Sequence, residues 1–263
     1  MSKAQEYVTL RSANRAELAM VMLLIAAGLI MFFGSVVQGA IGFALGMIAV
    51  PLLVEAGFSL SQAVALTTLA IGIQVLFGAW QLRAHIPWGD IKLAAALRYL
   101  TLPIGVLLLL SVESLAAEDM KRLVGLGVLL GALLRGFARS GTVRDLPAAV
   151  SIATFCLSGL LQGLVAMGGP PLVLWMTTRA FSARQARAFT MTLFLLNAPV
   201  QVALLLFLSR TMSADVLLLA LALAPVIYLG TTIGVRVGDR FSKPLLNKAA
   251  LGVLLLIALN AII

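Results

Sequence analysis

The sequence predicts an all-α integral membrane protein built from two related halves. Of its 263 residues, 62% are hydrophobic and only 11% are charged, whereas a soluble domain carries roughly 25% charged residues. Several apolar runs reach the ~20 residues that cross a bilayer as a helix. The polar–apolar alternation of a β-barrel is absent from the sequence. Because only helices and closed barrels satisfy every backbone group in lipid, we expect helices.

The charge pattern fits a membrane surface better than a nucleic acid. The formal net charge is +9, and the lysines and arginines lie mostly between the apolar runs, where they set topology and meet anionic headgroups. Cys156 is the only cysteine, which excludes an internal disulfide and a cysteine-based metal cluster. The sequence shows no buried carboxylate pair, nucleophile triad or phosphate loop, so we expect neither an enzyme nor a bound cofactor or metal.

The chain contains an internal duplication. The pattern Phe-Ser-x-x-Gln-Ala begins at Phe58 and again at Phe181, and Gln38-Gly39 recurs as Gln162-Gly163 at nearly the same separation. Each half has one long apolar stretch interrupted at Gln-Gly, followed by three simpler apolar runs, which gives about 8–10 helices in all. The predicted units are a polar N-terminal tail (1–17), repeat 1 (18–140) and repeat 2 (141–263).

Equivalent loops of the two halves differ in charge, which predicts opposite orientations in the membrane. Loop 57–61 has no basic residue, whereas its counterpart carries Arg179, Arg184 and Arg187. The two following pairs of loops also exchange their basic side. Because basic loops stay cytoplasmic, the halves form an inverted repeat; the basic N-terminal tail alone runs against this. Inverted repeats are typical of secondary transporters, with the substrate site near midplane between the repeats.

The interrupted stretches predict helical hairpins. The arms around Gln162-Gly163 have about 15 residues, or ~22 Å of helix, which is short for the ~30 Å bilayer core. We therefore expect a turn at Gln162-Gly163 and another at Gln38-Gly39, each either re-entrant or joining two short spans. If each second arm begins at the glycine, its free N–H groups point into the cavity and suit an anion.

The candidate site residues are glycines, amides and hydroxyls of these stretches and of the helices after them. Close helix packing is the alternative role for the glycines, and interhelical hydrogen bonding for the amides. Arg98 is expected to reach the membrane interface rather than an anion. The predicted substrate-binding residues are Gln38, Gly39, Gly42, Phe43, Thr67, Gln74, Gln162, Gly163, Gly168, Gly169, Thr190 and Asn197.

These motifs resemble those of the TauE/SafE family of sulfite exporter-like proteins, over nearly the whole chain. The motifs that carry the resemblance are Gly34, Gln38-Gly39, Gly42-Phe43 and Pro51-Leu52-Leu53 in the first half, and Gly159, Gln162-Gly163 and Gly168-Gly169-Pro170-Pro171 in the second. The resemblance implies transport of sulfite, organosulfonates or related small anions in a bacterial inner membrane. It also implies that both Gln-Gly segments contribute to the substrate site.

The sequence thus predicts a secondary transporter, in the exporting direction, of a small anion such as sulfite or an organosulfonate. Its site would lie between the repeats and work by alternating access. A small-solute or anion channel of the same architecture stays open as an alternative, as does an assembly factor that moves no solute. The expected partners are the anion and the bilayer lipids, with a homodimer left open and no nucleic acid.

Overall fold

A computed structural model describes residues 3–112, 147–209, 212–241 and 252. The apolar runs predicted over 120–136 and 245–262 lie outside these described residues. Within them, every regular element is a helix and none is a strand, which confirms the all-α prediction.

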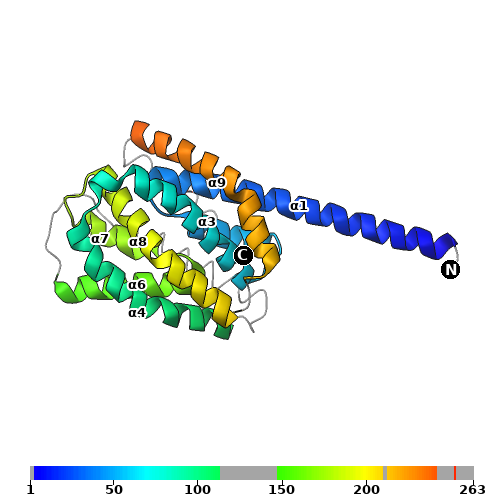
Figure 1. The fold of residues 1–263 in the computed structure, drawn as a ribbon, viewed down its shortest axis with the longest axis horizontal. Coiled ribbons are helices and arrows are strands. Elements are labelled where there is room, and N and C mark those ends of the chain that lie inside the picture. Colours follow the sequence, from blue (N-terminus) through cyan, green and yellow to red (C-terminus); the bar gives the residue numbers. More distant parts are fainter. Residues whose placement is uncertain (1–2, 113–146, 210–211, 242–251, 253–263) are drawn as a thin grey trace.

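The first half begins with a long helix and a short one. Helix α1 spans Lys3–Ile41 and is followed by α2 (Leu45–Glu55), α3 (Leu60–Gln81), the 3-10 turn η1 (Arg83–His85) and α4 (Trp88–Val112). The N-terminal part of α1 projects away from the bundle (Figure 1).

The second half repeats this order. Helices α6 (Ala148–Val165) and α7 (Gly169–Thr177) again pair a long helix with a short one. They are followed by α8 (Ala183–Leu204), the π-helical stretch η2 (Leu205–Ser209) and α9 (Ala214–Arg240). Pro103 lies inside α4 and Pro225 inside α9.

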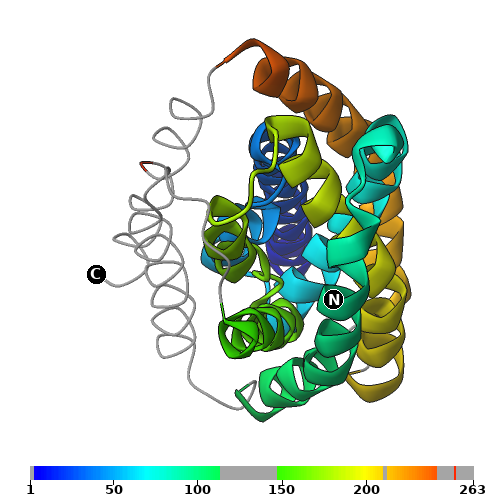
Figure 2. The same cartoon turned by 90° about the vertical axis from the view of Figure 1, so that its left-hand side faces the viewer.

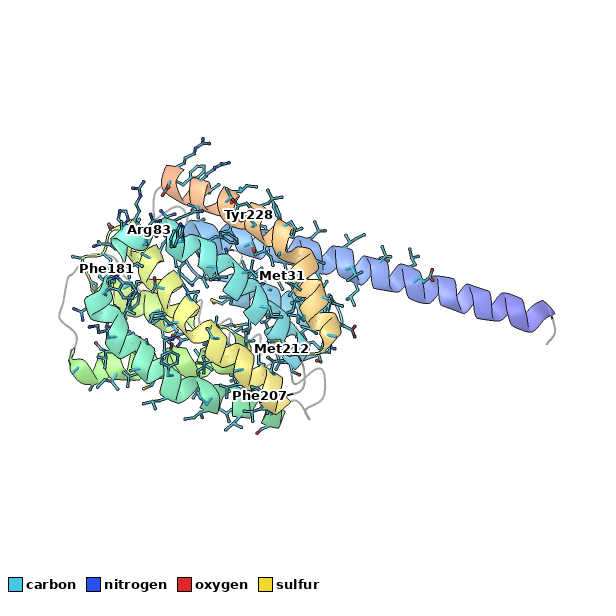
Figure 3. All side chains as sticks on the ribbon, viewed as in Figure 1. Met31, Arg83, Phe181, Phe207, Met212 and Tyr228 are labelled. Carbon is cyan, nitrogen blue, oxygen red and sulfur yellow. The ribbon has the colours of Figure 1, made fainter. Side chains whose placement is uncertain are left out.

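Six described helices are long and apolar enough to cross a membrane: Val21–Ile41 of α1, α3, α4, α6, Ala183–Leu208 and α9. The short helices α2 and α7 have 11 and 9 residues, or roughly 16 and 14 Å at 1.5 Å per residue. The outer surface is apolar: Trp80 is 69% exposed and Phe207 84%. Phe207 points away from the bundle, and Met31 lies between helices (Figure 3). The chain is a multi-pass membrane protein.

The duplicated Phe-Ser-x-x-Gln-Ala motif starts a helix in both halves. The hydroxyl of Ser59 accepts a hydrogen bond from the Gln62 N–H, and the Gln62 side chain accepts one from the Ser59 N–H (3.2 and 3.0 Å). Ser182 and Gln185 form the same capping box on α8 (3.2 and 2.9 Å). Each box satisfies two N–H groups that a helix start leaves unpaired, so the motif fixes where α3 and α8 begin.

The two halves interdigitate, because three helices of the first half each pack against a helix of the second. Helix α1 of the first half lies along α9 of the second, and α4 lies along α6 (Figures 1 and 2), while α3 packs against α8. Exchanging the halves converts the α1–α9 pair into the α6–α4 pair, so the contact pattern has two-fold character. Both long pairs approach closely through glycines: Gly39 meets Gly234, and Gly163 meets Gly105. Such small-residue contacts are typical of membrane helices.

The predicted turns at the Gln-Gly pairs are wrong by several residues. Helix α1 continues to Ile41 and α6 continues to Val165, so both Gln-Gly pairs lie within the last turns of long helices. The chain leaves the helix at 42–44 and at 166–168 instead. Gly39 and Gly163 lie inside these helices, and each packs against the backbone of a partner helix.

Candidate functional site

The first helix break, residues 42–44, requires unusual backbone. Gly42 has φ +92° and Ala44 has φ +120°. Residues other than glycine rarely adopt these backbone angles. The Gln38 side chain reaches across this break. Its Oε1 accepts a hydrogen bond from the Leu45 N–H at 2.9 Å. The amide of one helix thus caps the start of the next, where backbone N–H groups lack partners.

The second break, residues 166–168, is built in the same way. Ala166 has φ +55°, and its N–H donates back to the Gln162 carbonyl at 3.0 Å. Gln162 Oε1 accepts from the Gly168 N–H at 3.1 Å. One difference follows from the sequence: Pro170 and Pro171 stand in the first turn of α7 and carry no N–H, so α7 offers fewer free donors than α2.

The two breaks lie against each other in the interior. A Cβ placed on Gly46 would lie 1.9 Å from the Ala166 carbonyl oxygen, and one on Gly169 would lie 2.7 Å from the Phe43 ring. The backbone contact leaves no room for a side chain at Gly46, and at Gly169 an added Cβ would require the Phe43 side chain to move. The breaks of the two halves therefore form one structural unit.

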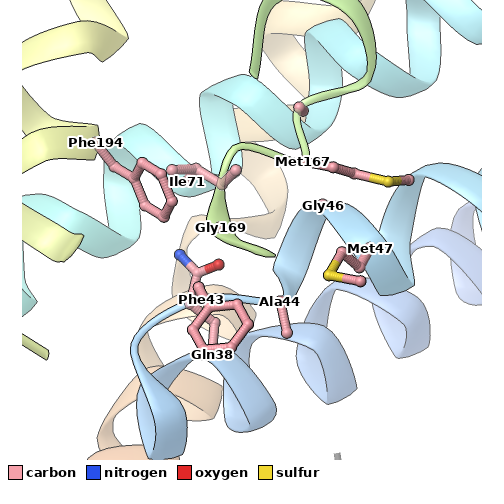
Figure 4. A pocket seen from close by; sticks show the side chains of 10 residues that line it. Gln38, Phe43, Ala44, Gly46, Met47, Ile71, Met167, Gly169 and Phe194 are labelled. Carbon is pink, nitrogen blue, oxygen red and sulfur yellow. The ribbon is translucent and has the colours of Figure 1, made fainter. Parts of the chain in front are cut away.

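A small pocket lies where the breaks meet, with about 10 Å³ open to the centre of a water molecule. Figure 4 shows the amide of Gln38 between the rings of Phe43 and Phe194. While Gln38 Oε1 caps α2, its Nε2 is buried without a hydrogen-bond partner. The residues that line the pocket are Gln38, Phe43, Ala44, Gly46, Met47, Ile71, Ala166, Met167, Gly169 and Phe194.

Arg98 lies beside the second break, and the expectation that it reaches the interface is wrong. Its side chain is fully buried, at 0% exposure. Its Nε donates to Asn197 Oδ1 at 2.5 Å, and its Nη1 donates to the Ser158 hydroxyl. Ser158 in turn donates to the Gly168 carbonyl at 2.5 Å. The guanidinium carbon lies 5.3 Å from the centre of the Phe194 ring, and Nη2 has no partner.

Gln201 supports the second break directly. Gln162 Nε2 donates to Gln201 Oε1 at 3.0 Å, and Gln201 Nε2 donates to the Gln162 carbonyl at 2.8 Å. This reciprocal pair holds the Gln162 amide in place. Gln162 Nε2 is therefore satisfied, in contrast to Gln38 Nε2.

The other predicted residues lie further from the pocket lining. Gln74 Nε2 donates to the Ser35 carbonyl of α1 at 3.0 Å, as expected of an interhelical amide. Thr190 donates to the Ala186 carbonyl within α8 (3.2 Å). Thr67 is buried with an unpaired hydroxyl. Gly42 and Gly168 lie in the breaks, next to Arg187 and Arg98 respectively.

The buried groups around the breaks have more unsatisfied donors than acceptors. Gln38 Nε2, Arg98 Nη2 and Asn197 Nδ2 are donors without partners. Gln38 Oε1 accepts a hydrogen bond from the Leu45 N–H, and Asn197 Oδ1 accepts one from Arg98 Nε, which fixes the orientation of both amides. Buried polar groups are normally paired, so this region suits a ligand that supplies acceptors, such as an oxyanion. Among the described residues, no group of three His, Cys, Asp or Glu could hold a metal.

Sequence reasoning named Gln38, Gln162 and Asn197, placed Arg98 at the membrane interface, and did not name Ser158 or Phe194. The one available signal was an arginine inside an apolar run, because such a residue is costly in lipid and marks function by default. Gln201, another polar residue within an apolar helix, carried the same signal.

Six membrane-length helices around a small interior pocket, with unpaired buried donors at and near it, are the architecture of a multi-pass membrane transporter. The family model described as "Sulfite exporter TauE/SafE" matches residues 19–261, so the chain belongs to this family, as its motifs predicted. The "Probable sulfite/organosulfonate exporter TauE" of Cupriavidus necator is 26% identical over 226 residues, covering 84% of this chain and 87% of the relative. No solved structure matches the chain.

Proposed function

We propose that this protein is a secondary transporter that exports a small sulfur oxyanion, sulfite or an organosulfonate, across a bacterial inner membrane. The observation that carries the proposal is the excess of buried, unpaired donors at the meeting of the two breaks, with Gln38 Nε2 facing the pocket. The unprotonated oxygens of a sulfonate or of hydrogen sulfite accept hydrogen bonds, so they complement these donors. The similarity to a probable exporter of sulfite and organosulfonates supports the same substrate class.

The pocket walls suit a short carbon stem beside the oxyanion head. Phe43, Met47, Ile71, Met167 and Phe194 give the pocket an apolar lining around the single amide of Gln38. Apolar side chains combined with a few placed polar groups are the usual lining of a small-molecule site.

Inverted repeats with alternating access are part of this proposal. The repeated helix order and the exchange of the α1–α9 and α6–α4 pairs support a two-fold relation between the halves. Loops expected to be cytoplasmic also meet: Arg179 lies 4.0 Å from Asp90. Arg83 and Phe181 lie toward one end of the bundle and Met212 toward the other (Figure 3). Rocking of one repeat against the other would open the pocket to each side in turn.

The test is transport by the purified full-length protein in liposomes. We expect saturable uptake of labelled sulfite or 2-hydroxyethanesulfonate, with counterflow from preloaded vesicles. Gln38→Ala and Gln162→Ala should reduce it at least tenfold. Gln62→Ala, which removes an exposed helix-capping glutamine, should leave it nearly unchanged. Uptake equal to empty liposomes, by folded protein, would refute the assignment. Flux that does not saturate and lacks counterflow would favour a channel.

A further inference from the structure

Arg98 is a buried cation with no counter-charge among the described residues. Its side chain is at 0% exposure, and its hydrogen bonds go to the neutral groups of Asn197 and Ser158. The other buried arginine of the described residues, Arg187, pairs with Asp239 at 2.5 Å. A guanidinium keeps its charge in proteins, and burying one without an anion is strongly unfavourable. No described residue supplies an anion to Arg98, and a bound anionic ligand would provide the missing counter-charge.

The neighbours of Arg98 hold it at the edge of the transport site. Asn197 fixes Nε, and Ser158 links Nη1 to the Gly168 carbonyl of the second break. These contacts leave Nη2 as the free donor. Phe194 lines the pocket, and its ring centre lies 5.3 Å from the guanidinium carbon of Arg98, which does not itself line the pocket.

We propose that Arg98 is the residue that binds the negative charge of the transported anion, and that Phe194 covers it in the conformation described here. This assignment rests on the proposed function. Asn197 and Ser158 act as positioning residues for the guanidinium. Rotation of the Phe194 ring uncovers Arg98 Nη2, so that this donor and Gln38 Nε2 bind one ligand.

A charge rule follows from this arrangement. One uncompensated positive charge neutralises one negative charge, so a singly charged anion leaves the closed site neutral. A doubly charged anion leaves a net charge in a region of low dielectric, which is strongly disfavoured. The site therefore selects hydrogen sulfite and monoanionic sulfonates over sulfate and over sulfonates that carry a second acidic group.

The first experiment uses the wild-type protein in liposomes at fixed ionic strength. Uptake of labelled 2-hydroxyethanesulfonate is measured against unlabelled competitors of one negative charge (methanesulfonate) and of two (sulfate, sulfoacetate). We expect the monoanion to compete at least tenfold better than either dianion. Dianions that compete as well as methanesulfonate overturn the charge rule. A wild-type protein that takes up no sulfonate overturns the proposed function instead.

The second experiment compares Arg98→Gln and Arg98→Lys with Arg83→Gln, an exposed arginine stacked on Trp80. Arg98→Gln should raise the KM at least tenfold and abolish the preference for monoanions. Arg98→Lys, which keeps the charge, should retain that preference with weaker binding. Arg83→Gln should match wild type. If Arg98 is only structural, folded Arg98→Gln protein keeps the wild-type KM and charge preference, and the assignment fails. If neither Arg98 variant folds, the wild-type competition series decides.

Discussion

Gly46 in the first turn of α2 lies against the backbone of Ala166 in the second break, so closely that an added Cβ would be 1.9 Å from the Ala166 carbonyl oxygen. This contact joins the two halves at their helix breaks, where the chain has left α1 and α6. If the two repeats rock against each other, this contact either persists or breaks in each transport cycle. Transport should therefore be sensitive to a substitution at Gly46.

Gly46→Ala should therefore disrupt the fold and abolish transport. The new methyl group would meet backbone atoms, which cannot move away as a flexible side chain can, so we expect a loss of at least about 3 kcal/mol. Thermal unfolding in detergent and liposome uptake would measure the two effects. The control is Gly72→Ala in α3, where the nearest atom to an added Cβ is 3.9 Å away. A Gly46→Ala protein as stable as Gly72→Ala would contradict the close contact.

Gln38→Glu should separate the two roles of Gln38. A carboxylate can still accept the hydrogen bond from Leu45, so the cap on α2 persists. It cannot donate as Nε2 does, and it places a negative charge where we propose that an anion binds. We expect a folded protein with at least tenfold lower uptake, and Gln38→Ala should additionally lose about 1–3 kcal/mol because the Leu45 N–H is left unpaired.

Gln62→Glu is the control for the two Gln38 variants, because the Gln62 side chain caps α3 at the exposed surface. It should leave both transport and thermal stability close to wild type. Full transport by Gln38→Glu would argue against an anion at this amide.

Asp239→Asn should destabilise the protein by leaving Arg187 without its counter-charge. The Arg187 side chain is 4% exposed, while that of Asp239 is 42% exposed. Breaking a fully buried pair costs about 3–5 kcal/mol, and the exposure of the carboxylate lowers our expectation to about 1–3 kcal/mol. Thermal unfolding would show this against Asp215→Asn, an exposed carboxylate at the other end of α9. The double variant Arg187→Gln/Asp239→Asn should recover part of the loss, and strict additivity would contradict a direct pair.

Composition and periodicity predicted the class of this fold, because the cost of unpaired backbone in lipid leaves few alternatives. The repeated Phe-Ser-x-x-Gln-Ala motif predicted equivalent positions, and both copies turned out to be capping boxes. The breaks were displaced from the Gln-Gly pairs because each glutamine acts across a distance. Gln38 caps a helix that starts seven residues later, and sequence spacing does not reveal which backbone group a side chain reaches.

Arg98 shows a second limit of prediction from the sequence. An arginine nearly three turns inside a membrane helix, as Arg98 is in α4, can turn to the interface or to the interior, and the local sequence is the same in both cases. The choice depends on Asn197 and Ser158, which lie 99 and 60 residues away in the chain. Long-range contacts of this kind come only with the packed structure.

The opposite orientation of the halves can be tested at two equivalent residues. Ser59 and Ser182 are both exposed helix caps at the start of α3 and α8, so a cysteine at either should cost the same loss of a cap, about 1 kcal/mol. In a Cys156→Ala background, we expect Ser59→Cys to react with a membrane-impermeant maleimide in intact spheroplasts. Ser182→Cys should react only after permeabilisation, because the basic loop that contains it stays cytoplasmic. Labelling of both from the same side would mean that the halves are parallel. Alternating access would then require a symmetry other than the one proposed here.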